Sequence, residues 1–516
     1  MLPNKIFEFR ESKFSELSEL TADNILSENT ASKVKKRKNQ LFQKIMLFRR
    51  NVLTNFNHDK PYTNSIPMDF KEILNLIPNN DERIYLINYI FLNDTQNVNR
   101  IISKYQNQAN FNIDYNQLSS SKYLLDIIET NNYILKIIIQ NKSNINYLIN
   151  KINLMSNQQI PYDHNYIMIY SYFLISDENV DHLLKKEINN NNIFELIIKN
   201  ETEISYIYLF FIYSYIYHFN NQQIEQSDNI LDSLFSIIKS KKNCKNDNLL
   251  WEIYNLLTFF SKIPKFIYKF YDNFDYIFVK REFYEKDIIT IEKLKIVYNI
   301  FNNLNNEGIN HFLKKDTGNI LNLILFTLNI LAKIDNNCNN IKGKKMALFL
   351  ESVKILEIIT SYKDLTYILL ENKRCLNLIL KAFENLVLIN NEDNNLLLNE
   401  ICYNIFITVK NIIIFEHKIF IRRFKGEKLH KNIKNKFEYY IKNNFIKEEI
   451  FLPLMDILIL LYENDKKDIF QKETFKMDFD SVNLYDSILN IGLKFYNYGN
   501  IHNKCYAFIG NYYQNK

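Results

Sequence analysis

The chain has 516 residues, a net charge of +6, and only seven glycines and seven prolines. Sandwiches, barrels and doubly wound sheets use Gly and Pro at their tight turns, so this shortage argues against all three. The first glycine is Gly308, which excludes a glycine-rich phosphate loop before it. With 47% hydrophobic residues, the sequence favours a large all-α protein whose turns are built mostly from Asn.

Two basic segments stand out along the chain. Residues 33–50 hold eight Lys or Arg and no acid, and residues 410–447 hold eleven Lys or Arg against three acids. Each segment contributes +8 to a total of +6, so the remainder carries −10. An acidic body with a basic arm suits the binding of basic peptides, including its own arm. A solvated helix face is the alternative for each basic run.

Long apolar segments recur with a period near 41 residues. They begin near Asp81, Ser121, Asp163, Ile204, Asp247 and Asp287, and again at wider spacing near Lys342, Asn391, Phe445 and Gly499. Shorter apolar segments precede several of them, as at residues 70–77, 192–198 and 229–238. About ten such units are typical of armadillo or HEAT repeats, which stack into a right-handed superhelical α-solenoid. A large helical globule without repeats is the alternative.

The sequence offers little support for catalysis. Its eight His are isolated, its five Cys have no zinc spacing, and no HExxH or GxSxG motif is present. We therefore expect no enzyme activity, no cofactor and no metal. The longest uncharged apolar run, residues 204–218, is short for a membrane span, so we expect a buried helix there and no membrane span.

One pair of residues suggests a binding role. Trp251 and Asn255 are four apart in a predicted helix, so they share a face. A Trp ring can hold a Lys side chain, and an Asn amide can hold an extended peptide backbone. Aligned strings keep Asn299, Asn404 and Asn88 but have Lys295, Glu400 and Ile84 at the Trp position, and a core role for Trp251 is the alternative.

This Trp-x-x-x-Asn pair resembles the groove-lining motif of the importin alpha family, whose members are armadillo-repeat adaptors for nuclear import. The basic arm resembles that family's importin-beta-binding segment, a basic helix that ends in a string like Arg-Arg-Asn-Val. Residues 498–513 resemble its closing helix. The resemblance assigns autoinhibition and importin-beta binding to Lys35, Lys36, Arg37, Lys38, Lys44, Arg49 and Arg50.

The resemblance implies an arm over residues 1–60 and a solenoid over residues 64–516. It also implies binding of nuclear localisation signals at Trp251, Asn255, Asn299, Asn404 and Asn88. Importin beta would capture the arm, and an export receptor with Ran would recycle the protein between cytoplasm and nucleus. An armadillo scaffold without signal recognition is the main alternative. Nucleic-acid binding by residues 410–447 is a further one, which is disfavoured because no stacking aromatics other than Tyr439 and Tyr440 alternate with its charges.

Overall fold

The computed structural model of the protein describes residues 70–105, 120–130, 132–188, 190–200, 206–218, 228–240, 247–278, 287–315, 319–331, 344–388, 396–426, 429–444, 446–467 and 483–513. Within these ranges every regular element is a helix and no strand occurs, so the predicted all-α class is confirmed for the described chain. The chain divides into two compact units, Met1–Phe260 and Ser261–Lys516.

The first unit pairs short amphipathic helices with apolar ones. Among its apolar helices, α11 and α14 pack against each other, and α10 packs against α13. Its helices are α4 (Phe70–Leu76), α5 (Asn80–Phe91), α6 (Thr95–Tyr105), α8 (Ser121–Thr130), α9 (Asn132–Gln140), α10 (Lys142–Ser156), α11 (His164–Ser176), α12 (Glu178–Glu187), α13 (Asn190–Asn200), α14 (Tyr206–Ile216), α16 (Asp228–Ser240) and α17 (Asp247–Ser261).

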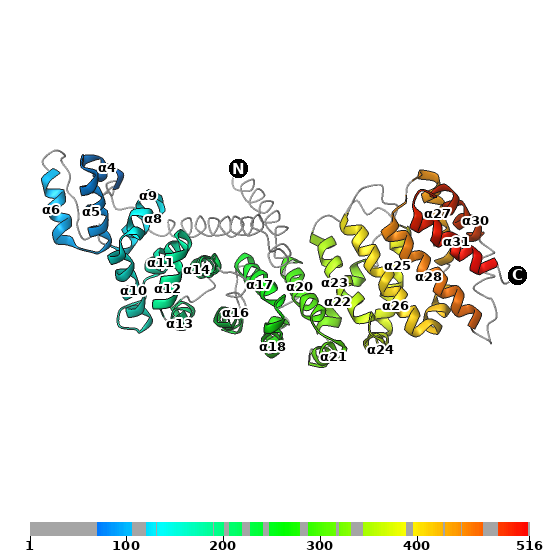
Figure 1. Cartoon of the computed structure of the whole chain (residues 1–516). Coiled ribbons are helices and arrows are strands. Elements are labelled where there is room, and N and C mark those ends of the chain that lie inside the picture. The colour runs from blue at the N-terminus through cyan, green and yellow to red at the C-terminus, as the bar shows by residue number, and fades with distance from the viewer. Residues whose placement is uncertain are drawn as a thin grey trace, which may run out of the picture. The chain divides into compact units, whose positions relative to one another are not determined.

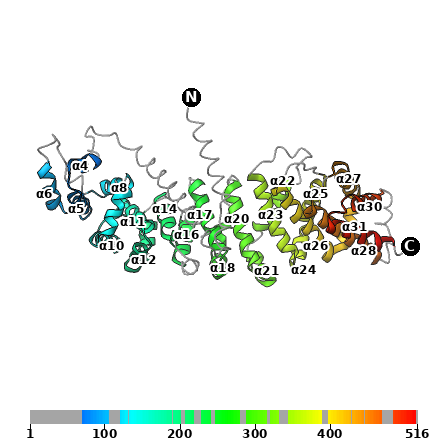
Figure 2. The same cartoon turned by 45° about the horizontal axis from the view of Figure 1, so that its top comes forward.

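The second unit is organised around a series of long helices. Helix α23 packs against α20 and α26, and α28 packs against α26 and α31, as both Figure 1 and Figure 2 show. The helices are α18 (Ile267–Asp272), α19 (Phe274–Phe278), α20 (Asp287–Asn302), α21 (Asn306–Lys315), α22 (Asn319–Leu331), α23 (Lys344–Thr360), α24 (Lys363–Glu371), α25 (Lys373–Leu388), α26 (Leu396–Gly426), α27 (Leu429–Asn443), α28 (Glu448–Lys467), α30 (Leu484–Lys494) and α31 (Gly499–Tyr513). A 3-10 turn, η2 (Pro264–Phe266), precedes α18.

A helix begins within a few residues of each of the ten predicted starts, from α5 at Asn80 to α31 at Gly499. The length differs near Ser121, where a long helix was expected. Helix α8 does begin there but has only ten residues, and the long helix of that region is α10. The apolar run predicted as a buried helix forms α14, whose residues 207–216 are buried.

Asn supplies turn and cap chemistry in place of Gly. The Asn79 side chain caps α5 by accepting from two backbone amides, and the Asn141 side chain caps α10 by accepting from one. Asn93, Asn444 and Asn483 adopt positive φ, a conformation that Asn tolerates better than most residues. The Asn-rich composition is therefore compatible with well-formed helix ends in this part of the chain.

Candidate functional site

The predicted Trp-Asn pair shares a face of α17 and is largely buried. Trp251 is 6% exposed, and Asn255 is 7% exposed. The Asn255 amide donates to Glu252 Oε2 at 3.4 Å, and the same oxygen accepts the Tyr213 hydroxyl of α14 at 2.7 Å. Asn255 thus belongs to a polar contact between α14 and α17, and the burial of Trp251 fits the core role considered for it.

Helices α20, α23 and α26 of the second unit share a common register. In each helix a buried pair is followed, after two positions, by a second buried pair, and a charged residue stands directly before the first pair. The charged residues are Lys295, Lys354 and Glu400. The buried pairs are Ile296–Val297 and Ile300–Phe301 in α20, Ile355–Leu356 and Ile359–Thr360 in α23, and Ile401–Cys402 and Ile405–Phe406 in α26.

This register places Asn299 and Asn404 at equivalent positions, just before the second buried pair. Asn299 is half-buried and donates to the Ser261 hydroxyl at 2.9 Å. Asn404 is buried and donates to the Glu400 backbone carbonyl at 2.7 Å. Helix α23, which packs between α20 and α26, has Ile358 at the same place. The two predicted Asn positions are therefore separated by an apolar one.

The fifth predicted residue, Asn88 on α5, also has a partner inside the protein. It is buried, and its carbonyl oxygen accepts from the Asn144 amide of α10 at 2.7 Å. Asn144 donates in addition to the Ile138 backbone carbonyl. All four predicted asparagines thus form intramolecular hydrogen bonds, through the amide nitrogen in three of them and through the oxygen in Asn88.

A set of ion pairs that sequence reasoning missed lies on the long helices of the second unit. Lys354 contacts Glu400 of α26 at 3.1 Å, and Lys295 contacts Glu292 within α20 at 3.0 Å. Burial lowers the pKa of Lys354, but the charges of Glu351 and Glu400 outweigh this effect and the pKa is raised. The sequence signal that could have indicated these ion pairs is the charged residue directly before the first buried pair of each helix.

The ion pairs continue to the C-terminal end of the unit. Asp456 of α28 accepts from Lys410 of α26 at 2.8 Å and also pairs with Lys504 of α31. Burial raises the pKa of Asp456, but the hydrogen bonds from the two lysines outweigh it and the pKa is lowered. We call Lys295, Lys354, Glu400, Lys410, Asp456 and Lys504 the charged strip.

The proposed arm residues Lys35, Lys36, Arg37, Lys38, Lys44, Arg49 and Arg50 lie outside the described residues. No group of three or more His, Cys, Asp or Glu side chains that could hold a metal ion occurs in the described parts of the chain. Cys375 and Cys505 are buried free thiols, and burial raises the pKa of each to about 12. Such thiols are unreactive as nucleophiles at neutral pH.

One described stretch, Leu396–Glu416, is long and apolar enough to cross a membrane. It forms most of α26, which packs against α23 and α28, and 56% of its apolar window is buried within the protein. A core helix meets the same criteria of length and composition.

Comparison with known proteins assigns no family. No family model matches the chain, and no curated protein matches it. One solved structure, the crystal structure of an engineered protein, resembles it with 12% sequence identity and a TM-score of 0.47, covering 86% of this chain and 98% of the engineered one. The helix arrangement is therefore supported by the contacts within this chain and not by the comparison.

Proposed function

We propose that this chain is a non-enzymatic adaptor of the importin alpha type. Its helices would form an armadillo-like solenoid of about ten repeats whose groove holds basic nuclear localisation signals. Its N-terminal arm would bind importin beta, and an export receptor with Ran would return it from nucleus to cytoplasm. The regular helix starts and the shared register of α20, α23 and α26 support a repeat of this kind.

The observation that carries the proposal is a row of carboxylates along successive long helices. Glu292, Glu351, Glu400 and Asp456 lie on α20, α23, α26 and α28. Glu292 and Glu351 are buried, three residues before Lys295 and Lys354, and Glu400 is itself the charged residue of the register in α26. The Glu400 side chain is 48% exposed. Carboxylates placed on neighbouring helices attract successive Lys or Arg side chains of an extended peptide.

Each of these carboxylates now faces a lysine of the chain itself. Lys354 lies between Glu351 and Glu400, at 3.9 and 3.1 Å. A basic peptide would have to displace this lysine in order to bind the same carboxylates. The internal lysines therefore act as competitors, and removing one of them should favour the peptide.

Peptide titration of Lys354→Gln tests this arrangement. We expect its affinity for a fluorescent peptide of the Lys-Lys-Arg-Lys type to rise about two- to fivefold, the gain expected when an exposed ion pair no longer competes. Lys345→Gln is the matched control, because Lys345 is an exposed lysine of the same helix and the charge change is identical. Equal affinities of the two variants would contradict the proposal.

Two further variants test the Trp251 and arm assignments. Trp251→Ala should weaken peptide binding if Trp251 lines the groove, and equal affinity would remove it from the site. Deletion of residues 1–60 should abolish importin-beta binding and strengthen groove binding of basic peptides.

An interaction scaffold without signal recognition is the second candidate. The specific observation that favours it is the engagement of Asn88, Asn255 and Asn404, which are buried and hydrogen-bonded inside the protein. A scaffold would show no binding of basic peptides in any of these variants, and deletion of the arm would leave its partners unchanged.

A further inference from the structure

The register of the long helices places a tyrosine at equivalent positions of α20 and α26. Tyr298 and Tyr403 each lie three residues after the charged residue of the register and directly before its Asn. Residues three apart share one face of a helix, so each tyrosine lies beside that charged residue. Helix α28 continues the register, because Asp456 stands directly before the buried pair Ile457–Leu458, and Leu461–Tyr462 follows after two positions.

Tyr298 shows what a tyrosine at this position can hold. The Lys354 Nζ atom of α23, which packs against α20, lies 5.8 Å from the centroid of the Tyr298 ring. At this distance the face of a ring attracts a cation. Lys354 is itself the charged residue of the register in α23. The tyrosine of one helix therefore receives the charged residue of the next helix.

Tyr403 does not receive a lysine in this way. The next helix, α28, has the acidic Asp456 at the position that Lys354 occupies in α23, and Asp456 is paired with Lys410 and Lys504. Tyr403 is 39% exposed, and its side chain makes no hydrogen bond, ring contact or cation contact within the described residues. The ring position that is filled in α20 is therefore open to a ligand in α26.

The carboxylates near Tyr403 determine which kind of side chain fits there. Glu400 lies one turn before Tyr403 on the same face, is 48% exposed, and accepts from Lys354 at 3.1 Å. Lys354 also pairs with Glu351, and its charge acts on Glu357 as well, so three carboxylates share one lysine. The two oxygens of a carboxylate can accept further hydrogen bonds. A second cation that lies over an aromatic ring complements this arrangement.

We propose that Tyr403 holds one Lys or Arg side chain of the bound basic peptide. The cation lies over the Tyr403 ring and contacts the carboxylate of Glu400. This inference rests on the proposed function, and it adds a residue that selects a basic side chain at one position of the peptide. That residue lies at neither the Trp nor the Asn position of the predicted groove.

Peptide titration of Tyr403→Leu tests the assignment. We expect its affinity for the fluorescent Lys-Lys-Arg-Lys peptide to fall about two- to fivefold, the effect of losing one exposed cation–ring contact. Tyr403→Phe, which keeps the ring, should restore most of the affinity. Tyr268→Leu is the matched control, because Tyr268 is an exposed tyrosine on α18 of the same unit and lies outside the register.

A second titration shows whether the Tyr403 ring itself contacts the peptide. Each basic residue of the peptide is replaced in turn by norleucine, which keeps the aliphatic stem of lysine without its charge. At one position the replacement should weaken binding to the wild type but should have little further effect in Tyr403→Leu. A purely structural role of Tyr403 would instead weaken all the peptides by the same factor.

Three results would overturn the Tyr403 assignment and leave the proposed function standing. They are equal affinity of the wild type and Tyr403→Leu, an equal loss in Tyr403→Phe and Tyr403→Leu, and additive effects at every peptide position. Absence of basic-peptide binding by the wild type would overturn both the assignment and the proposed function.

Discussion

The long helices of both units bury apolar side chains, but the contacts that accompany this burial differ. In the first unit, α11 and α14 meet through the ring pairs Tyr170–Phe211 and Tyr172–Phe210, at centroid distances of 5.8 and 5.2 Å. In the second unit, Lys354–Glu400 joins α23 to α26, and Asp456 joins α28 to both α26 and α31. Aromatic burial stabilises regardless of salt, whereas half-exposed ion pairs weaken as salt is added.

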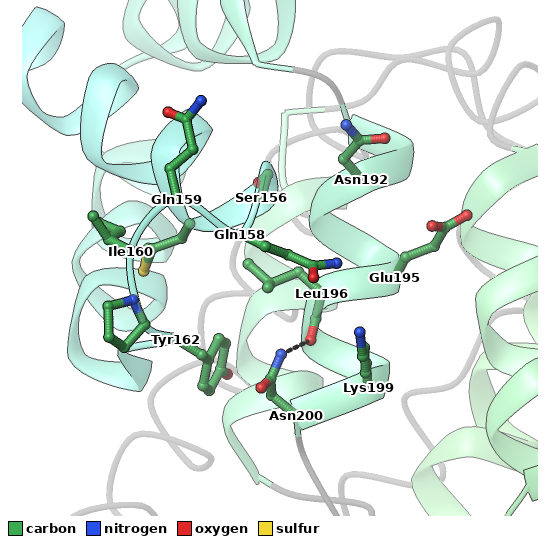
Figure 3. Close-up of a pocket in the computed structure, with 12 residues that line it drawn as sticks. Ser156, Gln158, Gln159, Ile160, Tyr162, Asn192, Glu195, Leu196, Lys199 and Asn200 are labelled. Carbon is green, nitrogen blue, oxygen red and sulfur yellow. Dashed lines mark hydrogen bonds between the residues drawn. The ribbon is translucent and has the colours of Figure 1, made fainter.

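This difference affects which unit has a face available to a charged ligand. Half-exposed ion pairs exchange partners at low cost, so the second unit presents charges that a peptide could recruit. The buried rings of the first unit are closed to solvent. A pocket in that unit is lined instead by carboxamides, with one acidic and one basic side chain, Glu195 and Lys199 (Figure 3). Breaking one interaction of each kind should therefore give distinguishable results.

The single tryptophan allows unfolding of the two units to be followed separately in one sample. Trp251 is buried in α17, within the first unit, and the second unit contains none. Tryptophan fluorescence therefore follows unfolding of the first unit, while far-ultraviolet circular dichroism follows both.

The largest effect should come from Phe211→Ala. Phe211 is fully buried and contacts the rings of Tyr170, Phe194 and Tyr215. Truncation of such a ring leaves a cavity and should cost about 3–5 kcal/mol of unfolding free energy. Urea titration should show this loss in the fluorescence transition. Phe211→Leu, which keeps most of the volume, should lose less, and an equal loss in both variants would argue against the ring contacts.

The next effect concerns pH and a buried ion pair in the first unit. Asp181 lies 2.6 Å from Lys185 on α12, and Lys185 stands over the Tyr215 ring at 4.7 Å. Burial raises the pKa of Asp181 to about 6, more than the charge of Lys185 lowers it. Tyr170 and Tyr215 also face this carboxyl group, and Glu178 and His182 share its helix.

The folded state therefore holds the Asp181 proton more tightly than the unfolded state does. Its stabilising contribution is present below about pH 4 and is lost as pH rises through 6. The wild type should thus lose roughly 3 kcal/mol relative to Asp181→Asn between pH 4 and pH 7. Urea titrations of both proteins at a series of pH values, followed by fluorescence, measure this difference. A difference that stays constant with pH would contradict it.

Periodicity predicted the helices well because each long helix has to bury an apolar face. The apolar residues of that face recur at regular spacing within the helix's own sequence. Whether a polar residue on such a helix faces solvent or a neighbour depends on segments far away in the chain. Asn88 illustrates this, since its partner Asn144 lies 56 residues later. No sequence pattern near Asn88 predicts that contact.

The abundance of Asn also made the candidate site hard to predict from the sequence. Asn404 donates to the backbone carbonyl four residues earlier, and the same local bond is made by Asn200, Asn273, Asn303 and Asn443. Asn at helical positions therefore often serves its own helix in this protein. Ion-pair partners could not be predicted from the sequence either, because Lys410 and Asp456 meet only through the packing of α26 on α28.

The smallest effect should follow from Asp456→Asn. The stability contribution of Asp456 should depend on pH in the opposite direction to that of Asp181. The lysines Lys410 and Lys504 lower the pKa of this half-exposed carboxyl, so its contribution is present above the ordinary aspartate pKa and is lost as pH falls through the lowered value. We expect a loss of about 1 kcal/mol at pH 7 and low salt, shrinking in 0.5 M salt and at pH 2–3. Circular dichroism should report the change while the Trp251 fluorescence transition stays in place. A matching shift in fluorescence would show that the two units unfold as one, and would remove the contrast between them.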